Sequence, residues 1–386
     1  MILPPATLGV LGGGQLGRYF VLAARELGYR TLVLDPDPHS VAGAVANRHL
    51  VAAYDDEAAL LEVAAQCAAV TTEFESVPAA ALARLERSIP VRPGAAAVAL
   101  CQDRVTEKAF LRSHGFPHAP SADLLREEDC ERCDASLFPG ILKTARLGYD
   151  GKGQARVADR AAARAAFRRF GAVPCVLEQL QPLDGELSVV LARDAQGITR
   201  CFPPSANHHR HGILDHSTTP LPDTPYHGTA ERATELAARI AERMGYVGTL
   251  GVEFFLARGA LLVNEIAPRP HNSGHYTLDA CVTNQFEQQV RALCALPLGD
   301  SDAHCAAVCV NLLGDLWYPD GSSTPREPDW ARLLEFPGLR LHLYGKDEPR
   351  PGRKMGHFTV IGSDPEQVRP RAMAARAAIG IRGDCD

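Results

Sequence analysis

The sequence predicts an α/β fold that begins with a parallel sheet. A short apolar run, Thr7–Leu11, is followed by a glycine-rich turn and an amphipathic segment, and this alternation recurs along the N-terminal quarter of the chain. Alternating strands and helices are typical of a parallel sheet with helical crossovers. Later in the chain two apolar runs meet at a tight turn, and three further apolar runs precede the C-terminus, which indicates additional β structure.

Composition favours a globular protein of unremarkable charge. The 386 residues are 46% hydrophobic and carry a formal net charge of -6, which gives no broad electrostatic footprint for nucleic acid or an anionic membrane. No apolar run reaches membrane-spanning length, and the N-terminus lacks a signal-like apolar core. We therefore expect a cytoplasmic protein whose partners are neither nucleic acid nor membrane.

The 11 cysteines are scattered along the chain, so we expect most of them to be reduced and buried. Cys130 and Cys133 form the only C-x-x-C pair. Because no second pair or histidine accompanies them, one face of a short helix is a better explanation than a zinc site.

The first unit starts with a strand and a glycine motif. Residues 12–17 read G-G-G-Q-L-G, which matches G-x-G-x-x-G and opens a helix that Gly28 ends. Asp35 ends the next strand, Arg30–Leu34, about where a dinucleotide-binding fold has its ribose-binding acid. This part alone suggests a nicotinamide-dependent oxidoreductase. The loop would equally suit another anion, such as a ribose phosphate, or only tight packing without a ligand.

Two acids follow the third strand of this unit. Helices are expected at 56–67 and 78–87, with a strand, Ala69–Thr72, between them. Glu73 and Glu75 then lie at the carboxyl end of that strand, where ligands of open α/β sheets bind. Simple solvation of these glutamates is the alternative.

The next segment carries cations and a glycine-rich flap. The expected helix at 103–114 has Arg104 and Lys108 on one face, which is either solvated or faces an anion. Residues 121–136 are acidic and are expected to be irregular, as a passage into a smaller domain. The expected strand at 140–143 ends in Lys143. Residues 148–154 read G-Y-D-G-K-G-Q, a flap whose backbone could close over phosphates, or a plain surface hairpin; it lacks the G-K-[ST] ending of a P-loop.

The later elements alternate between strands and helices. We expect helices at 159–170, 229–244 and 284–296, and strands at 176–179, 186–191, 307–313, 339–344 and 357–361. Residues 207–211 read N-H-H-R-H and are expected to form a loop, in which adjacent histidines would point apart and make a poor metal cluster. Lys346, Arg353 and Lys354 belong to a Pro/Gly loop that is either solvated or suited to a phosphate monoester.

Two glutamates flank the tight turn at 257–259, between the expected strands 250–256 and 261–263. If the turn has three residues, Glu253 and Glu265 lie on one face as near cross-strand neighbours. A divalent cation would then relieve their repulsion, and Mg²⁺ held by carboxylates usually adds phosphate oxygens to its shell. Two solvated glutamates are the alternative, and a two-residue turn would put them on opposite faces.

Seven motifs together carry a family resemblance. They are G-G-G-Q-L-G-R, E-F-E, G-Y-D-G-K-G-Q, N-x-H-x-x-G-I-L, G-V-E-F-F, N-E-I-A-P-R-P-H-N-S-G-H and P-G-R-K-x-G-H. In this order they resemble the N5-carboxyaminoimidazole ribonucleotide synthetases, ATP-grasp carboxylate-amine ligases of bacterial purine biosynthesis. The resemblance covers nearly the whole chain. Ala206 replaces a common acid and His211 a usual aspartate, which affects that loop but spares Asn207 and His209.

The resemblance implies three domains. A Rossmann-like (pre-ATP-grasp) domain would occupy residues 1–102 and an ATP-grasp domain residues 103–298, with a small flap-bearing subdomain at about 116–178. A small C-terminal β subdomain would occupy residues 299–386.

The resemblance also implies a set of site residues. Mg²⁺ would be held by Glu253 and Glu265, and Arg269 and His271 would hold bicarbonate, with Lys354 also catalytic. The ribotide would be bound by Gln15, Leu16, Glu75, Asn272, Lys346, Arg353 and Lys354. ATP would be contacted by Arg104, Lys143, Gly148, Tyr149, Asp150, Gly151, Lys152, Gly153, Gln154, Glu178, Gln179, Leu180, Gln181, Glu186, His209, Asn264 and Glu265.

The implied reaction uses ATP to phosphorylate bicarbonate to carboxyphosphate, which carboxylates 5-aminoimidazole ribonucleotide on its exocyclic amine. The implied cofactors are ATP and Mg²⁺, and the family resemblance suggests a homodimer and a functional link to the downstream mutase. The alternatives are another ATP-grasp ligase acting on an amine-bearing ribotide and, more remotely, the nicotinamide-dependent oxidoreductase.

Overall fold

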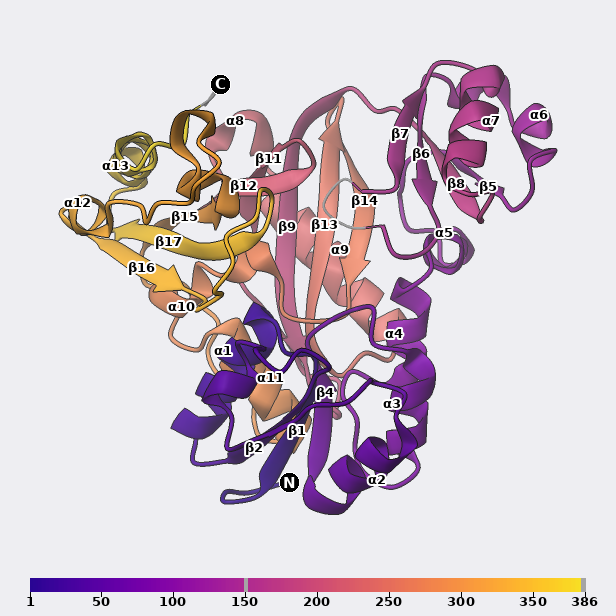
Figure 1. The fold of residues 1–386 in the computed structure, drawn as a ribbon. Helices are drawn as coiled ribbons and strands as arrows, with labels where there is room; N and C mark the ends of the chain where they lie inside the picture. Colours follow the sequence, from indigo (N-terminus) through magenta and orange to yellow (C-terminus); the bar gives the residue numbers. More distant parts are fainter. Residues whose placement is uncertain (149–151, 383–386) are drawn as a thin grey trace.

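The computed structural model describes residues 1–148 and 152–382 and contains three β-sheets (Figure 1). The first is parallel, with the order β3-β2-β1-β4. Its strands are β1 (Thr7–Leu11), β2 (Arg30–Leu34), β3 (Arg48–Leu50) and β4 (Ala69–Thr72). Its helices are α1 (Gln15–Glu26), α2 (Glu57–Gln66), α3 (Ala79–Glu86) and α4 (Ala95–Cys101). The predicted Rossmann-like parallel sheet is thereby confirmed.

The second sheet is antiparallel and forms the small lobe at the upper right of Figure 1. Its order is β5-β8-β6-β7, and α5 (Arg104–Ser113) leads into it. Its elements are β5 (Ser121–Leu124), α6 (Asp129–Arg132), β6 (Gly140–Thr144), β7 (Gln154–Val157), α7 (Arg160–Arg169) and β8 (Cys175–Gln179).

One prediction for this lobe was wrong. Residues 121–136 were expected to be irregular, whereas they contain β5 and the short helix α6. Cys130 and Cys133 point into the core of the lobe with Leu124 and Phe167, so apolar packing orders a segment whose acidic residues suggested a loop. The prediction of a short helix around the C-x-x-C pair was correct.

The third sheet has nine strands and spans the rest of the chain. Its order is β14-β13-β9-β11-β12-β15-β17-β16, and β10 pairs with β9. The strands are β9 (Leu183–Arg193), β10 (Thr199–Cys201), β11 (Ser205–Arg210), β12 (Ile213–Thr219), β13 (Gly248–Ala257), β14 (Ala260–Ala267), β15 (Ala306–Leu313), β16 (Leu339–Leu343) and β17 (Lys354–Gly362). The C-terminal strands thus continue the same sheet through the β12–β15 ladder.

The loop expected at 207–211 was also wrong, because most of this segment belongs to β11. Asn207 pairs with Glu186 of β9 in the ladder, and His208 pairs with His216 of β12. Polar side chains on this strand hid the alternation of apolar and polar residues by which strands are recognised.

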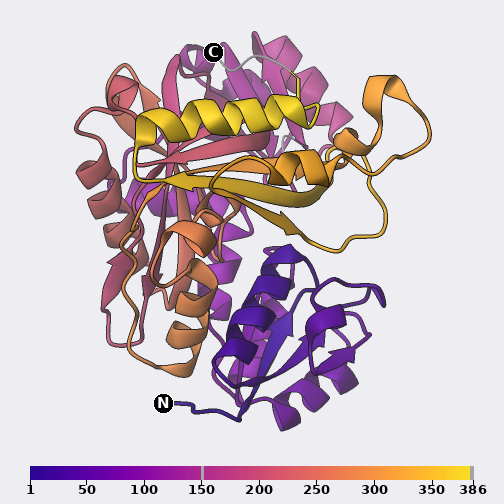
Figure 2. The same ribbon diagram turned by 90° about the vertical axis from the view of Figure 1, so that its left-hand side faces the viewer.

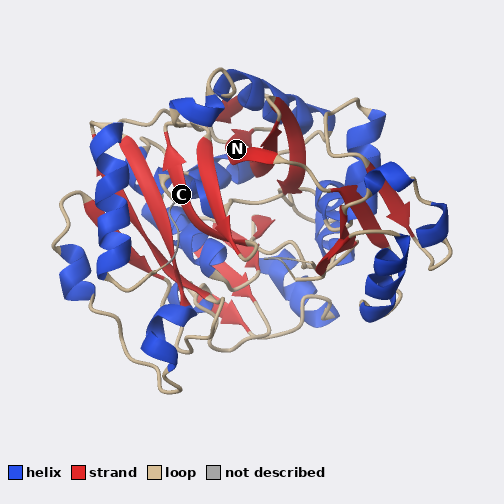
Figure 3. Cartoon of the chain, turned by 90° about the horizontal axis from the view of Figure 1, so that it is seen from above, coloured by secondary structure: helices blue, strands red, loops and turns tan. Residues whose placement is uncertain are grey.

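Helices cover the faces of the large sheet. They are α8 (Asp223–Tyr226), α9 (Ala230–Arg243), α10 (Thr277–Ala280), α11 (Gln285–Cys294), α12 (Trp330–Leu334) and α13 (Pro365–Ala378). Short 3-10 helices lie at Gly43–Val45, Ala135–Leu137, Asn272–Gly274, Gly314–Trp317 and Pro319–Gly321. Figure 2 shows α13 lying across β17. Figure 3, the view from above, shows the strands of the large sheet mainly on the left and the small lobe on the right. Among the described helices, none has the length and apolar character to cross a membrane.

Candidate active site

The β13–β14 hairpin brings two glutamates directly opposite each other, but by a different route from the one expected. The turn has two residues, Arg258 and Gly259, both with positive φ, rather than three. A two-residue turn alone would put the glutamates on opposite faces. A register shift next to Glu253 leaves Asn264 as an extra residue on β14, so Glu253 pairs with Glu265.

The paired glutamates are held by different neighbours. Arg104 donates to Glu265 at 3.0 Å, and this guanidinium contributes to a lowered pKa of the Glu265 carboxyl despite its burial. Burial, with the nearby Glu265 and Glu186 carboxylates, raises the pKa of Glu253 above its ordinary value. Asn264 donates to Glu253 at 3.3 Å. The pair therefore lacks full compensation of its negative charge on the Glu253 side.

Asn264 presents an acceptor at the same place. Its side-chain oxygen is buried and has no hydrogen-bond partner among the described residues. Lys108 donates to the Asn264 backbone carbonyl at 3.0 Å, so α5 supports the bulge from behind. Two carboxylates and an amide oxygen make an all-oxygen donor set of the kind that Mg²⁺ prefers.

A buried cluster of charge joins α5 to the small lobe. Glu178 lies 2.7 Å from the Lys143 ammonium and 3.1 Å from that of Lys108. These cations hold the pKa of Glu178 at about 2, against the opposing effect of burial. Lys108 is fully buried, so the alternative of a solvated face on this helix is wrong. Gln179, Leu180 and Gln181 follow Glu178 at the end of β8 and on the connection to β9.

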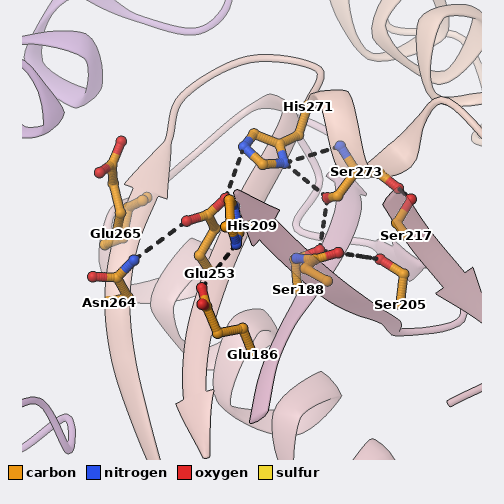
Figure 4. Close-up of polar contacts among 12 residues, drawn as sticks. Glu186, Ser188, Ser205, His209, Ser217, Glu253, Asn264, Glu265, His271 and Ser273 are labelled. Atoms are coloured by element: carbon orange, nitrogen blue, oxygen red, sulfur yellow. Dashed lines mark hydrogen bonds and ion pairs between the residues drawn. The ribbon is translucent and has the colours of Figure 1, made fainter. Parts of the chain in front are cut away.

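Neighbouring strands bring Glu186 and His209 together. Glu186 lies on β9 and His209 on β11, and the Glu186 carboxylate is 2.9 Å from His209 Nδ1. Glu186 and Glu253 raise the pKa of His209 above its ordinary value, even though its burial acts in the opposite direction. Figure 4 shows the His209 ring between the two glutamates.

His271 is fixed by a chain of hydroxyl groups that sequence reasoning missed. Its Nδ1 lies 2.8 Å from Ser273 Oγ, Ser188 donates to Ser273 at 2.6 Å, and Ser205 is 3.2 Å from Ser188 (Figure 4). Burial and the nearby cations lower the pKa of His271 well below its ordinary value, so its ring is neutral at pH 7. Only the N-S-G-H motif around Ser273 could have indicated this network from the sequence.

Arg269 is bound to one of the acids at the end of β4. Its Nε and one terminal nitrogen donate to a Glu75 oxygen at 3.0 and 2.7 Å. The sequence assigned these two residues to different ligands, bicarbonate and the ribotide. The structure brings them into direct contact at the junction of the parallel and antiparallel sheets.

Two of the residues expected at the ribotide, Gln15 and Lys346, are in direct contact at the first turn of α1. Lys346 donates to the Gln15 side chain at 2.9 Å and to the Lys354 carbonyl at 2.6 Å. Arg353 donates to the Glu348 carbonyl at 2.8 Å. The side-chain oxygen of Asn272 is buried without a hydrogen-bond partner among the described residues. The Leu16 side chain, in contrast, is buried in the core of the first domain.

The glycine loop is closed by acids of the protein itself. Gly13 donates to Asp35 at 2.6 Å, and the Tyr54 hydroxyl donates to the same carboxylate at 2.5 Å. Asp35 is therefore engaged within the fold rather than presented to a ribose. This geometry counts against the dinucleotide interpretation of the first domain.

A cavity of about 180 Å³ lies where the three sheets approach each other. Glu75, Arg104, Glu265 and Gly148 are among the residues that line it. Glu107, which the sequence did not single out, also lines it, and burial raises the pKa of this carboxyl to about 7.

The flap is described only in part. Arg104 donates to the Gly148 carbonyl at 3.2 Å, and Gly153 accepts from the Thr144 backbone at 2.9 Å. Lys152 is part of a turn, and Gln154 begins β7. The expected ATP contacts Tyr149, Asp150 and Gly151 lie outside the described residues.

The sequence matches three domain families in succession. Residues 5–102 match a ribonucleotide synthetase preATP-grasp domain, and residues 109–286 match an ATP-grasp domain. Residues 307–371 match a phosphoribosylaminoimidazole carboxylase C-terminal domain. This order agrees with the family expected from the motifs, and the last two matches share the nine-stranded sheet.

Curated relatives align over nearly the full chain. The sequence is 45% identical over 362 residues to the N5-carboxyaminoimidazole ribonucleotide synthase of Brucella melitensis, covering 93% of this chain and 97% of the relative. It is 38% identical over 363 residues to the Bacillus subtilis enzyme of the same name, covering 94% and 93%.

Solved structures share the fold over the same extent. An N5-carboxyaminoimidazole synthetase from Staphylococcus aureus complexed with ADP superposes with a TM-score of 0.88 at 35% identity, covering 97% of this chain and 98% of that one. An Aspergillus clavatus synthase in complex with ADP and 5-aminoimidazole ribonucleotide gives a TM-score of 0.87 at 26% identity, covering 97% and 98%.

Proposed function

Because the chain belongs to the N5-carboxyaminoimidazole ribonucleotide synthase family, we propose that it uses ATP and bicarbonate to carboxylate 5-aminoimidazole ribonucleotide in purine biosynthesis. The products are N5-carboxyaminoimidazole ribonucleotide, ADP and phosphate. The observation that carries this proposal is the convergence of three groups of residues along 264–272. Glu265 faces the cations of α5, Arg269 binds Glu75, and Asn272 lies beside the Ser273 network.

The acidic hairpin fits Mg²⁺. The Glu253 and Glu265 carboxylates are cross-strand partners, and the buried Asn264 oxygen lacks a partner among the residues that the structure describes. We assign Glu253 and Glu265 as the residues that would hold the ion. When bound, Mg²⁺ would offset charge on the phosphate groups of ATP.

The nucleotide is assigned to the space between the small lobe and the hairpin. Arg104 and Lys143 supply positive charge near Glu265 and Glu178, and Glu186 and His209 lie beyond Glu253. Carboxylates hold these cations and the His209 ring in place before ATP arrives, so little reorganisation is needed on binding. The flap residues 148–154 and the Glu178–Gln181 segment complete this assignment.

Bicarbonate is assigned to Arg269 and His271. A guanidinium suits a planar anion with two oxygens, and Arg269 reaches this place from the end of β14. Neutral His271, oriented by Ser273, can donate or accept a hydrogen bond without adding a second charge. A bicarbonate oxygen would attack the γ-phosphorus of ATP, giving carboxyphosphate and releasing ADP.

The second step joins the two substrates. The exocyclic amine of the ribotide would attack the carbonyl carbon of carboxyphosphate, or the CO₂ released from it, and phosphate and one amine proton would leave. Gln15, Asn272, Lys346 and Arg353 are assigned to the ribotide, and Lys354 both to its binding and to this step. Exclusion of water matters, because both carboxylating species are labile.

We further propose that the protein is cytoplasmic and forms a homodimer. The downstream mutase would use its product. Size-exclusion chromatography with light scattering tests the dimer, and a pull-down with the purified mutase tests physical association. The homodimer and the link to the mutase rest on the family resemblance alone. The proposed reaction is also supported by the geometry of the site.

A coupled assay of ADP release tests the reaction. Release should require bicarbonate, 5-aminoimidazole ribonucleotide and Mg²⁺ together, and chelation with EDTA should stop it. Indifference to the imidazole ribotide would refute the proposal, and a requirement for formate instead of bicarbonate would favour a different ATP-grasp ligase. Incorporation of labelled bicarbonate into the product distinguishes these outcomes directly.

A further inference from the structure

The glycine loop at the start of α1 already contains an anion of the protein itself. Glu73 is buried, and its two oxygens accept from the backbone N–H groups of Gly14 at 2.8 Å and Gly17 at 3.1 Å. Loops of this kind and the helix dipole behind them usually attract an anionic ligand. The Glu73 carboxylate occupies that place.

The three glycines of the motif are shaped around this carboxylate. A Cβ at Gly12 would lie 2.6 Å from Glu73 Cγ, and one at Gly14 would lie 2.7 Å from Glu73 Oε1. At Gly17 it would lie 2.8 Å from the Gly12 carbonyl oxygen and 3.0 Å from Glu73 Cγ. The glycine pattern is therefore explained by close approach of Glu73 and needs no bound phosphate.

The same turn also reaches the proposed bicarbonate site. Glu73 is followed two residues later by Glu75, which binds Arg269 at 2.7 Å. Burial raises the pKa of Glu73, while its two backbone hydrogen bonds and Arg269 oppose that rise. A buried carboxylate is costly unless hydrogen bonds compensate it, and here those bonds fix the loop that carries Gln15.

We propose that Glu73 is a positioning residue: by filling the anion place of α1 it fixes the first turn of the helix, so that Gln15 and Leu16 are held for the ribotide whose phosphate Lys346, Arg353 and Lys354 receive. The Gly14 and Gly17 amides are engaged by Glu73, while those of Gln15 and Leu16 lie between them in the first turn. Lys346 donates to the Gln15 side chain at 2.9 Å. This inference rests on the proposed function. It also predicts that Glu73 keeps dinucleotide pyrophosphates out of the loop.

Steady-state kinetics of Glu73→Ala test this role. The KM for 5-aminoimidazole ribonucleotide should rise about tenfold, as expected for a lost charged hydrogen bond. The KM for ATP should stay within about twofold, since no nucleotide residue is changed. Formate or acetate should lower the raised KM again by refilling the vacated place, which a residue with only a structural role would not show. Glu57→Ala, at an exposed acid of α2, is the matched control.

A binding measurement tests the same inference without turnover. By calorimetry, Glu73→Ala should bind ADP-ribose at the opened loop, whereas the unmodified chain should not. Glu73→Gln is the second variant, and it covers the case in which the alanine variant does not fold. Its amide keeps one acceptor but sets a donor against a backbone N–H, so it should raise the ribotide KM without rescue by formate.

The outcomes separate this inference from the proposed function. If the unmodified chain shows no ribotide-dependent ADP release, the proposed function fails, while ADP-ribose binding still reports on the loop. If the unmodified chain is active but a folded Glu73 variant keeps its ribotide KM and binds no ADP-ribose, Glu73 has no positioning role and only this inference is overturned.

Discussion

The cations of the proposed nucleotide site are paired with carboxylates of the same site. Arg104 binds Glu265, and Glu178 lies between Lys108 and Lys143. Each charge is therefore held in place before a ligand arrives, and removal of one partner leaves the other uncompensated.

Glu265→Gln should lower turnover by about a hundredfold or more, since a proposed metal ligand is lost. The fold should remain, because the side chain is 34% exposed and the amide still accepts from Arg104. ADP release and circular dichroism measure the two effects. Glu242→Gln on the exposed face of α9 is the control. Near-normal ADP release by Glu265→Gln would argue against a metal role for the hairpin.

Arg269→Ala should raise the KM for bicarbonate much more than the KM for ATP. The guanidinium is bound to Glu75, at the ribotide side of the hairpin, rather than to any residue assigned to ATP. Initial rates with each substrate varied in turn provide the comparison, with the exposed Arg243→Ala as control. Equal increases in both constants would place Arg269 in the nucleotide site instead.

Among the elements, three of the four parallel strands were predictable, whereas the short strand β3 and the polar strand β11 were not. Thr7–Leu11, Arg30–Leu34 and Ala69–Thr72 were predicted with their observed bounds, because buried parallel strands are continuous apolar runs. The strand β11 was missed because site residues such as His209 interrupt its pattern. Its polar side chains contact other polar groups, such as Glu186 beside His209, so local propensity gave the wrong answer there.

The hairpin shows why register is harder to predict than element type. The pairing of Glu253 with Glu265 was expected from a three-residue turn, yet it arises from a two-residue turn and a bulge at Asn264. The shorter turn moves the side chains of β14 to the opposite face of the sheet, and the bulge at Asn264 moves them back. The two effects cancel, so Glu253 and Glu265 still share a face. Contacts such as Arg269 with Glu75 join residues far apart in sequence, so spacing alone could not reveal them.

A buried ion pair joins α13 to β12, beside the apolar contacts that the helix makes through Val368, Ala372 and Ala375. Arg376 is 2% exposed and donates to Asp215 of β12 at 2.9 Å. Arg376→Ala should destabilise the protein by about 3 kcal/mol, the lower end for breaking a buried pair, since Asp215 keeps its contacts with His216 and Arg210. Urea unfolding measures this loss, and Arg369→Ala on the exposed side of the same helix is the control. A loss no larger than that of the control would show that apolar packing alone docks α13.

For the whole molecule, two buried acids predict the response to low pH. Glu178 and Asp215 have pKa values of about 2, because Lys143 and Lys108 stabilise the charged form of Glu178 and hydrogen bonds with His216 and Arg376 stabilise that of Asp215. An acid with a lowered pKa stabilises the fold above its unfolded pKa of about 4, and this contribution is lost as pH falls towards the folded value.

The melting temperature should therefore fall steadily from about pH 4.5 to pH 2. Arg376→Ala should fall less steeply, because Asp215 then titrates closer to its unfolded value. Differential scanning fluorimetry across this range measures both slopes. Equal slopes for the two proteins would show that Asp215 does not contribute to acid sensitivity.

The continuous nine-strand ladder also limits which parts of the enzyme can move independently. β12 and β15 are hydrogen-bonded neighbours, so the strands of the β13–β14 hairpin and the strand that begins at Lys354 belong to one mechanical unit. A hinge at this junction would have to break ladder hydrogen bonds. The four-stranded lobe has its own sheet, and His118, in the segment that leads into it, forms an isolated β-bridge with Val263 of the large sheet. Closure over ATP is therefore expected as a swing of that lobe against a fixed platform.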